Sequence, residues 1–321
     1  MSPEAGNSGR VGNLLREDPD AFDALRDRTA ERLKVDPGAV EKDYWVTEVL
    51  RSAIAPFVGV DDLVFKGGTS LSKAYGIIER FSEDIDVIIV CQQTGHALKR
   101  LLRAVAQRAS DELGVGYEHE DEGKGFLNAR YSYTARRSVG FLTPGVLFEM
   151  GSRGGPSPNE QLPIRSLMSQ VAGETDPTAV EDYADLAVFQ ITVLAPERTL
   201  AEKLAFLHHR STVGDYDKLR EGARHLYDSA MLLKCDRVIG ALADSGIVEL
   251  MVDIDRRTAV AGWSFTPRPE RGFATSVAFG GDEAVTTALR DGYKQLANLV
   301  WGKLPTFDEA IDIVRSNRHL L

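Results

Sequence analysis

The sequence lacks the features of a membrane-bound or disulfide-stabilised protein. Its 321 residues include only two cysteines, Cys91 and Cys235, which are too few for a disulfide framework and lie in no metal-ligand spacing. No apolar run reaches the roughly 18 residues that a membrane span needs, and the N-terminus, MSPEAGNSGRVGNLLREDPD, lacks the basic and then apolar plan of a signal peptide. We therefore expect a cytoplasmic protein without membrane contact, with both cysteines in its core.

An excess of basic residues is also missing. The chain has 38 Lys and Arg against 48 Asp and Glu, a formal net charge of −10. This balance argues against nonspecific wrapping by nucleic acid, which needs a basic footprint, although a local basic patch is compatible with it. With 43% apolar residues, the chain is long enough for one large domain or two ordinary ones.

The chain divides into three regions by composition and periodicity. Residues 1–20 are rich in Gly, Ser, Pro and acids and show no periodicity, which indicates a disordered tail. Residues 21–195 begin with two or three helices, broken at Pro37-Gly38, and continue with strands mixed with helices, an α/β or α+β pattern. Residues 196–321 have helical periodicity throughout and predict a helical C-terminal domain.

Short β-branched runs predict the strands. We expect strands at 63–65, 85–90, 126–135, 145–150 and 187–194, and helices at 70–81 and 96–114, the second ended by Gly114. The segment GSRGGPSPNEQLP (151–163) is the clearest predicted loop.

The stretch LVFKGGTSLSKAYGIIERFSEDIDVIIV (63–90) carries the strongest chemical signal. Side chains alternate along a strand, so Asp84 and Asp86 are expected on one face. Two adjacent carboxylates repel each other unless a cation lies between them. Oxygen-only ligands favour Mg²⁺ or Mn²⁺, which commonly bind phosphate oxygens as well.

The glycines of the same stretch suggest where those phosphates bind. Gly67 and Gly68 leave room for a ligand, the following helix offers backbone N–H groups, and Ser70 and Ser72 offer hydroxyl donors, so a triphosphate fits there. Lys66 is equally compatible with a phosphate ligand and with a surface charge at a strand end. GGTSLSK is neither a P-loop nor a GxGxxG turn.

This strand, Gly-Gly, helix and D-x-D signature resembles the polymerase-β-like nucleotidyltransferases. FKGGTSLSKAYGIIERFSEDIDV is more closely similar to the AbiEii/AbiGii abortive-infection toxins, as are EKDYWVTEVL (41–50), PERTLAEKLAFLHHR (196–210) and ARHLYDSAML (223–232). The resemblance covers roughly residues 40–310 and implies an α+β core with a mixed sheet. Fifteen residues separate Gly68 from Asp84, more than the superfamily pattern has, and a longer helix is expected to absorb them.

The resemblance implies further site residues. It makes Glu149 a third metal-binding carboxylate beside Asp84 and Asp86, Lys203 a ligand of the nucleotide phosphates, and Asp228 an acid that orients Lys203 or a nearby base. The alternatives are that Glu149 ends a strand or pairs with Arg153, and that Lys203 and Asp228 are solvated charges on helices. The nucleotide-binding residues expected in all are Lys66, Gly67, Gly68, Thr69, Ser70, Ser72 and Lys203.

Function follows from the same resemblance. It implies a toxin of a toxin–antitoxin pair, with a cognate antitoxin as its partner. Such a toxin transfers nucleotides from an NTP, in some relatives to the 3′ end of tRNA. The transfer blocks translation and growth, which serves phage defence. Two basic clusters are candidates for holding the RNA: Lys99, Arg100, Arg103 and Arg108, and Arg130, Arg136 and Arg137. A protein hydroxyl as acceptor, including self-modification, and a catalytically silent nucleotide-binding module remain alternatives. The sequence leaves the NTP and the oligomeric state open.

Overall fold

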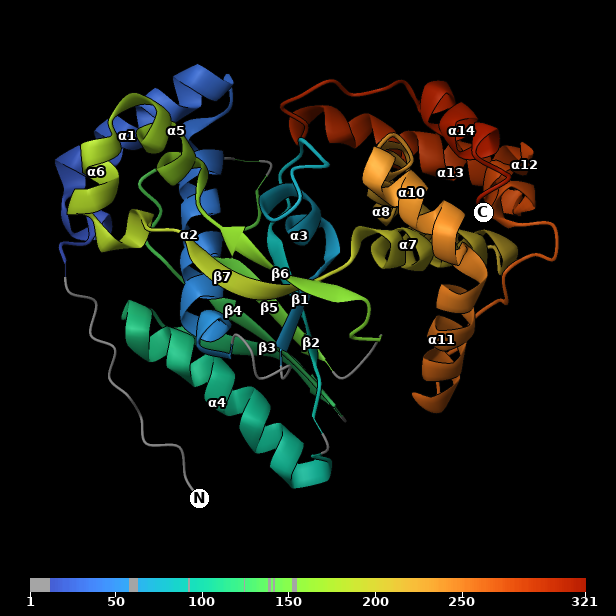
Figure 1. Cartoon of the computed structure of the whole chain (residues 1–321), viewed down its shortest axis with the longest axis horizontal. Helices are drawn as coiled ribbons and strands as arrows, with labels where there is room; N and C mark the ends of the chain where they lie inside the picture. The colour runs from blue at the N-terminus through green and yellow to red at the C-terminus, as the bar shows by residue number, and fades with distance from the viewer. Residues whose placement is uncertain are drawn as a thin grey trace.

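The structure is a computed structural model that describes residues 12–57, 63–91, 93–123, 125–137, 140, 142–151 and 155–321. A mixed sheet stands beside a group of C-terminal helices (Figure 1). This architecture confirms the expected α+β class. No helix of the described ranges combines the length and the apolar character needed to cross a membrane.

The N-terminal segment begins with a 3-10 turn, η1 (Leu15–Glu17), and two helices, α1 (Pro19–Leu33) and α2 (Pro37–Ala53). Both helices start with proline after an aspartate whose side chain accepts a backbone hydrogen bond, a strong start signal. A tail was expected over residues 1–20, and residues 1–11 lie outside the described part. From Asn13 onward the prediction is wrong, because Asn13 forms a bridge with Tyr183 and Leu15 is buried.

Seven strands form one mixed sheet in the order β3-β4-β5-β2-β1-β7-β6. The pairs β1–β7 and β2–β5 are parallel, and the other neighbours are antiparallel. The strands are β1 (Leu63–Lys66), β2 (Asp84–Ile89), β3 (Tyr117–Gly123), β4 (Phe126–Tyr131), β5 (Val146–Gly151), β6 (Asn159–Ile164) and β7 (Phe189–Leu194). The five predicted strands are all present; β3 was not predicted, and β6 lies in the segment expected to be a loop.

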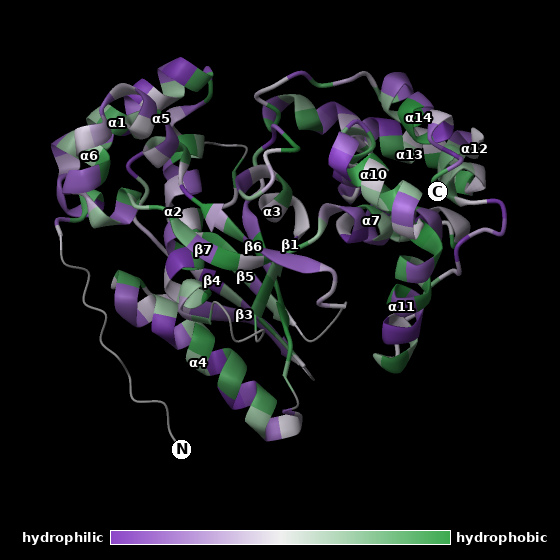
Figure 2. Ribbon diagram, in the orientation of Figure 1, coloured by the Kyte–Doolittle hydropathy of each residue, from purple (hydrophilic) through white to green (hydrophobic). Residues whose placement is uncertain are grey.

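Alternation along the strands gives the sheet two different faces. One face is apolar and packs under α2 and α4 (Gly95–Leu113), which ends at Gly114 as predicted. Figure 2 shows hydrophobic and hydrophilic residues alternating along α4, the pattern of a helix that buries one side. Ile85, Val87 and Phe148 point into this core, so the residues between them point to the opposite face.

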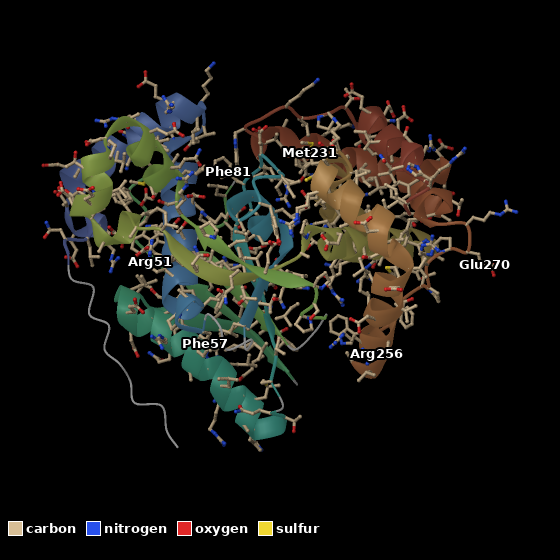
Figure 3. All side chains as sticks on the ribbon, viewed as in Figure 1. Arg51, Phe57, Phe81, Met231, Arg256 and Glu270 are labelled. Carbon is tan, nitrogen blue, oxygen red and sulfur yellow. The ribbon has the colours of Figure 1, made fainter. Side chains whose placement is uncertain are left out.

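The helix after β1 is shorter than expected. Helix α3 (Gly67–Lys73) ends after seven residues, and residues 74–83 form a loop rather than the continued helix predicted for 70–81. These residues do not continue the helix because segments distant in sequence bind them. The loop backbone bonds to the segment around Leu299 and Trp301, and the ring of Phe81, labelled in Figure 3, contacts that of Trp301.

Short helices connect β6 with β7, and a longer series follows the sheet. The connection is α5 (Leu167–Thr175), α6 (Pro177–Asp182) and η3 (Ala184–Leu186), and η2 (Ala55–Phe57) precedes β1. The C-terminal series is α7 (Pro196–Thr212), α8 (Tyr216–Glu221), α9 (Arg224–Leu232), α10 (Asp236–Ser245), α11 (Ile247–Val260), η4 (Phe273–Thr275), α12 (Val277–Gly280), α13 (Glu283–Lys294), η5 (Gln295–Asn298) and α14 (Phe307–Ser316).

The core of the C-terminal helices reaches into the sheet region. Leu71 of α3 and Ile78 of the following loop are fully buried in the same apolar cluster as Leu204 and Leu226. The cysteines, by contrast, are half-buried: Cys91 and Cys235 lie at the margins of apolar clusters rather than inside them, which corrects the expectation of two core cysteines.

Candidate active site

Three carboxylates lie on the polar face of the sheet. Asp84 and Asp86 alternate with the buried Ile85 on β2, and Glu149 stands directly opposite Asp86 on the parallel neighbour β5. The structure therefore brings together the three acids that the sequence singled out. Asn128 on β4 is the register partner of Glu149 and donates a hydrogen bond to it (3.2 Å).

The carboxylates repel one another. Burial and then the negative charges of Asp86 and Asp84 raise the pKa of Glu149 to about 7. Burial and the charge of Asp86 also raise the pKa of Asp84, although the Arg224 guanidinium, 4.0 Å away, opposes the rise. A cation placed among these oxygens would relieve the repulsion.

A preformed cage for such a cation is not present in the described ranges, where no three His, Cys, Asp or Glu side chains converge on one point. The carboxylate pair of Asp86 and Glu149, with Asp84 beside it, nevertheless fits Mg²⁺ or Mn²⁺. Mg²⁺ usually binds one or two carboxylates and takes its other ligands from water and substrate phosphates. The alternative partner of Glu149, Arg153, lies outside the described residues.

The two glycines have structural reasons of their own. Gly67 has a φ of +80°, and a Cβ there would overlap the carboxylate of Asp86. A Cβ at Gly68 would overlap the guanidinium of Arg80. Both glycines therefore let a charged side chain approach the backbone, a reason that adds to the expected room for a ligand.

The hydroxyls that follow are already engaged. Ser70 is fully buried and donates to the carbonyl oxygen of Gly67 (2.9 Å), and Thr69, also buried, donates to that of Asp84. Ser72 donates to the carbonyl oxygen of Thr69 (3.1 Å) and lines a different cleft. Both hydroxyls bond within their own helix, and neither serine lines the pocket beside the glycines, so donation by Ser70 and Ser72 to phosphates stays a prediction.

Lys203 and Asp228 meet in a buried charge cluster. The Lys203 ammonium lies 2.7 Å from one Asp228 oxygen, and the Arg80 guanidinium bonds to both oxygens at 2.7 Å. Asp228 is fully buried, so the alternative of a solvated surface acid does not apply to it. Burial raises its pKa, but Arg80 and Lys203 outweigh burial and hold it well below its usual range.

His225 completes this cluster. Burial, with the charges of Lys203 and Arg224, lowers the pKa of His225 well below its usual value, so its ring is neutral at pH 7. The Lys203 ammonium lies 3.3 Å from Nδ1 and can donate to it. Burial also lowers the pKa of Lys203, although Asp228 counteracts this.

A pocket of about 290 Å³ connects the glycines with this cluster. It is lined by residues of the sheet and of the C-terminal helices, among them Lys66, Gly67, Gly68, Arg80, Asp84, Asp86, Glu202, Lys203, Arg224 and His225. Burial lowers the pKa of Lys66, but Glu202 (3.2 Å away) and Asp86 outweigh it and raise the pKa. Lys66 is thus a half-buried cation at the rim of the carboxylates, not a surface charge.

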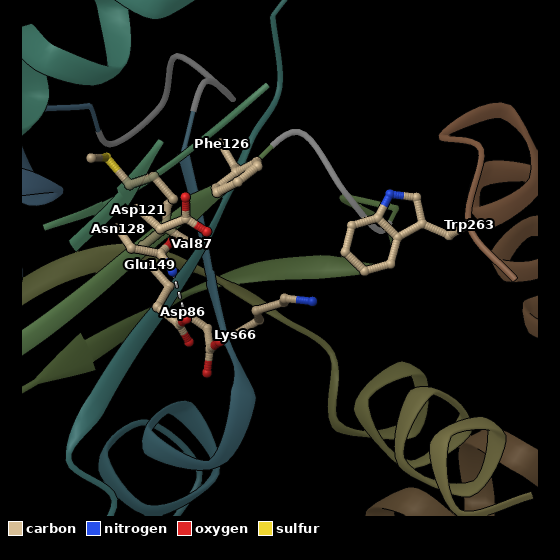
Figure 4. A pocket seen from close by; sticks show the side chains of 10 residues that line it. Lys66, Asp86, Val87, Asp121, Phe126, Asn128, Glu149 and Trp263 are labelled. Atoms are coloured by element: carbon tan, nitrogen blue, oxygen red, sulfur yellow. Dashed lines mark hydrogen bonds between the residues drawn. The ribbon is translucent and has the colours of Figure 1, made fainter. Parts of the chain in front are cut away.

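A second pocket, of about 430 Å³, opens on the Glu149 side of the same carboxylates (Figure 4). Lys66 and Asp86 line both pockets. Sequence reasoning missed Arg80 at the glycine pocket, and Phe126, Asn128 and Trp263 at the second pocket. Arg80 lies within the diagnostic stretch, but nothing in its local pattern indicates a partner 148 positions away.

Four of the seven residues in the basic clusters expected to hold RNA form ion pairs in the described part of the chain. Lys99 and Arg103 both pair with Glu122, at 3.0 and 2.8 Å. Arg130 pairs with Glu120, and Arg136 with Asp23. Acids of neighbouring elements thus offset part of the charge that the sequence shows as basic runs.

The sheet with its acidic face, and the glycine turn beside it, define a nucleotidyltransferase core. The sequence matches the family of AbiEii nucleotidyl transferase toxins, type IV toxin–antitoxin systems, over residues 48–313. The chain belongs to this family, which confirms the resemblance and implies a nucleotide substrate and an antitoxin partner.

A solved nucleotidyltransferase toxin has a similar fold. The nucleotidyltransferase toxin MenT4 (Rv2826c) of Mycobacterium tuberculosis H37Rv is 18% identical, with a TM-score of 0.55 over 92% of this chain and 88% of that one. JHP933 and a putative nucleotidyltransferase, both of Helicobacter pylori, are 13% and 14% identical, with TM-scores of 0.40 and 0.33. These matches cover 89% and 84% of this chain, and 95% and 93% of the Helicobacter pylori chains. Their structural similarity is too low to support a conclusion about fold or function. No curated protein matches the chain.

Proposed function

We propose that the protein is a Mg²⁺-dependent (or Mn²⁺-dependent) enzyme that transfers a nucleotide from an NTP to the 3′ end of tRNA, and so blocks translation and growth. The observation that carries this proposal is the pairing of Asp86 with Glu149 across two parallel strands, with Asp84 on the same face. A binding module without catalysis gains nothing from such repelling carboxylates.

The chain's own residues divide the work between the two sides of the carboxylates. The pocket beside Gly67 and Gly68 is lined by Lys66, Lys203 and Arg224, and these cations suit the triphosphate. Arg80 fixes the Asp228 carboxylate, and this carboxylate pairs with Lys203, so the ammonium is positioned before the nucleotide binds.

Asp84, Asp86 and Glu149 would hold the metal. A bound Mg²⁺ supplies charge neutralisation at the transferred phosphate and lowers the pKa of the attacking hydroxyl. Positioning and electrostatics together account for most of the catalysis expected in phosphoryl transfer.

The test is a transfer assay with each α-labelled NTP, Mg²⁺ and total tRNA. Asp86→Asn keeps the side-chain volume beside Gly67 and removes the charge, so labelling of tRNA should fall by more than about 100-fold while the thermal midpoint is maintained. Asp111→Asn, which changes an exposed acid on α4, is the matched control and should label tRNA normally. Full activity of Asp86→Asn would refute the proposed site.

The acceptor is read from the same gel. Label on RNA that disappears with Asp86→Asn supports the proposal, and its position at the 3′ end is checked by blocking the terminal hydroxyl. Label on protein alone would make a side-chain hydroxyl the acceptor instead.

A further inference from the structure

The pocket on the Glu149 side is lined by residues of the sheet and by one residue of the C-terminal helical region. Its walls come from the sheet, except for Trp263, which belongs to the segment after α11. Figure 4 shows the carboxylates and Phe126 together on one side of an opening and the Trp263 indole on the other. A volume of about 430 Å³ lies within the usual range of small-molecule sites.

Two aromatic rings mark this pocket. Phe126 begins β4 and is half-buried, and its ring lies over Gly123 so closely that a Cβ there would overlap it. Trp263 is 45% exposed, which is uncommon for so large an aromatic side chain. Nucleobases stack on such rings irrespective of their sequence, and each stacked base contributes substantially to binding.

The charges of the two pockets differ. The Trp263 pocket has three carboxylates, of Asp86, Asp121 and Glu149, against the one ammonium of Lys66. The pocket beside the glycines has four basic side chains against three acids. Phosphates are therefore favoured on the glycine side, whereas the Trp263 side suits a planar, uncharged group.

We infer that the Trp263 pocket receives the 3′-terminal nucleoside of the RNA acceptor, with its base against Trp263 and Phe126 and its ribose toward Glu149. The inference rests on the proposed function and deepens it, because a protein hydroxyl would have no use for an aromatic pocket of this kind. According to this inference, the pocket binds the RNA acceptor and not the base of the NTP.

The experiment combines a substitution in the protein with a change in the RNA. It measures RNA binding in the absence of transfer. A labelled short RNA and the same RNA without its 3′-terminal base are titrated with the full chain by fluorescence anisotropy, without NTP. For the unchanged protein, loss of the base should weaken binding by roughly 5- to 150-fold. Trp263→Ala should lose most of this difference between the two RNAs, with only the contact to Phe126 left, and Trp263→Phe should keep most of it.

Matched controls separate stacking from general damage. Phe265→Ala changes another exposed aromatic residue of the same segment, one that does not line the pocket, and it should retain the difference between the two RNAs. In steady-state assays, Trp263→Ala should raise KM for RNA and leave KM for NTP within about 2-fold.

Several results would overturn the inference: no RNA binding by the unchanged protein, equal binding of the two RNAs by that protein, an undiminished difference in Trp263→Ala, or a rise in KM for NTP alone. Base-dependent binding without any transfer would support the pocket and refute the proposed chemistry, so the two failures are distinguishable.

Discussion

The buried cluster of Arg80, Lys203 and Asp228 predicts a large and specific stability effect. Asp228→Asn keeps the shape of the side chain but removes the one negative charge between two cations that are 2% and 6% exposed. Uncompensated buried charges cost about 3–5 kcal/mol, so the free energy of unfolding should fall by that amount at pH 7. Urea denaturation followed by circular dichroism measures the change as a shift in midpoint at constant slope.

Lys203→Met is the matched comparison. It removes a buried charge as well but leaves the two-bond pair of Arg80 and Asp228 intact and neutral, so we expect a loss of less than about 2 kcal/mol. An equal or smaller loss for Asp228→Asn than for Lys203→Met would refute the reasoning, since the aspartate would then not be balancing two cations.

The pH dependence supplies an independent check. Burial already lowers the pKa of Lys203 in the folded protein, and loss of Asp228 lowers it further. At any pH between this lowered pKa and the ordinary pKa of an unfolded lysine, the unfolded state binds more protons than the folded state. Stability then rises with pH, and the penalty of Asp228→Asn should shrink from pH 7 to pH 9. A penalty that grows with pH would contradict the sign.

Three further results are expected. Gly67→Ala should cost about 1–3 kcal/mol and reduce transfer, because the added Cβ meets the Asp86 carboxylate at a positive φ; an unchanged urea midpoint would contradict this. Removal of divalent cations with EDTA should abolish transfer, with recovery on addition of Mg²⁺ or Mn²⁺; activity that persists in EDTA would exclude the metal. Arg103→Ala should change RNA affinity by less than about 2-fold in anisotropy titrations, because the guanidinium of this exposed arginine is already paired with Glu122.

The shared face of Asp84 and Asp86 was predictable because it depends on local geometry alone: a strand alternates its side chains whatever surrounds it. Glu149 lies on a strand distant in sequence, and it was found through the family resemblance rather than from local spacing. The end of α4 was also predictable from local geometry, since Gly114 adopts the left-handed conformation that stops a helix.

The features that could not be predicted from the sequence include those that depend on residues distant in the chain. The residues after Lys73 have helical periodicity, yet Leu71 and Ile78 are buried among the C-terminal helices and Arg80 is bound to Asp228, so the chain leaves the helix. The outer strands were missed for another reason. β3 (YEHEDEG) and β6 (NEQLPI) are edge strands whose charges and proline suit an exposed edge but give no apolar alternation.

The loop between α3 and β2 has a consequence for genetics. One short stretch of chain contributes the Asp86 strand to the sheet, Leu71 and Ile78 to the core of the helices, and Arg80 to the cluster that holds Lys203. We therefore expect substitutions in the interior of the C-terminal helices to disturb strand β2 and its proposed metal-binding carboxylates through this loop. A selection for variants that have lost their toxicity should collect many of its changes there, and not only among the carboxylates.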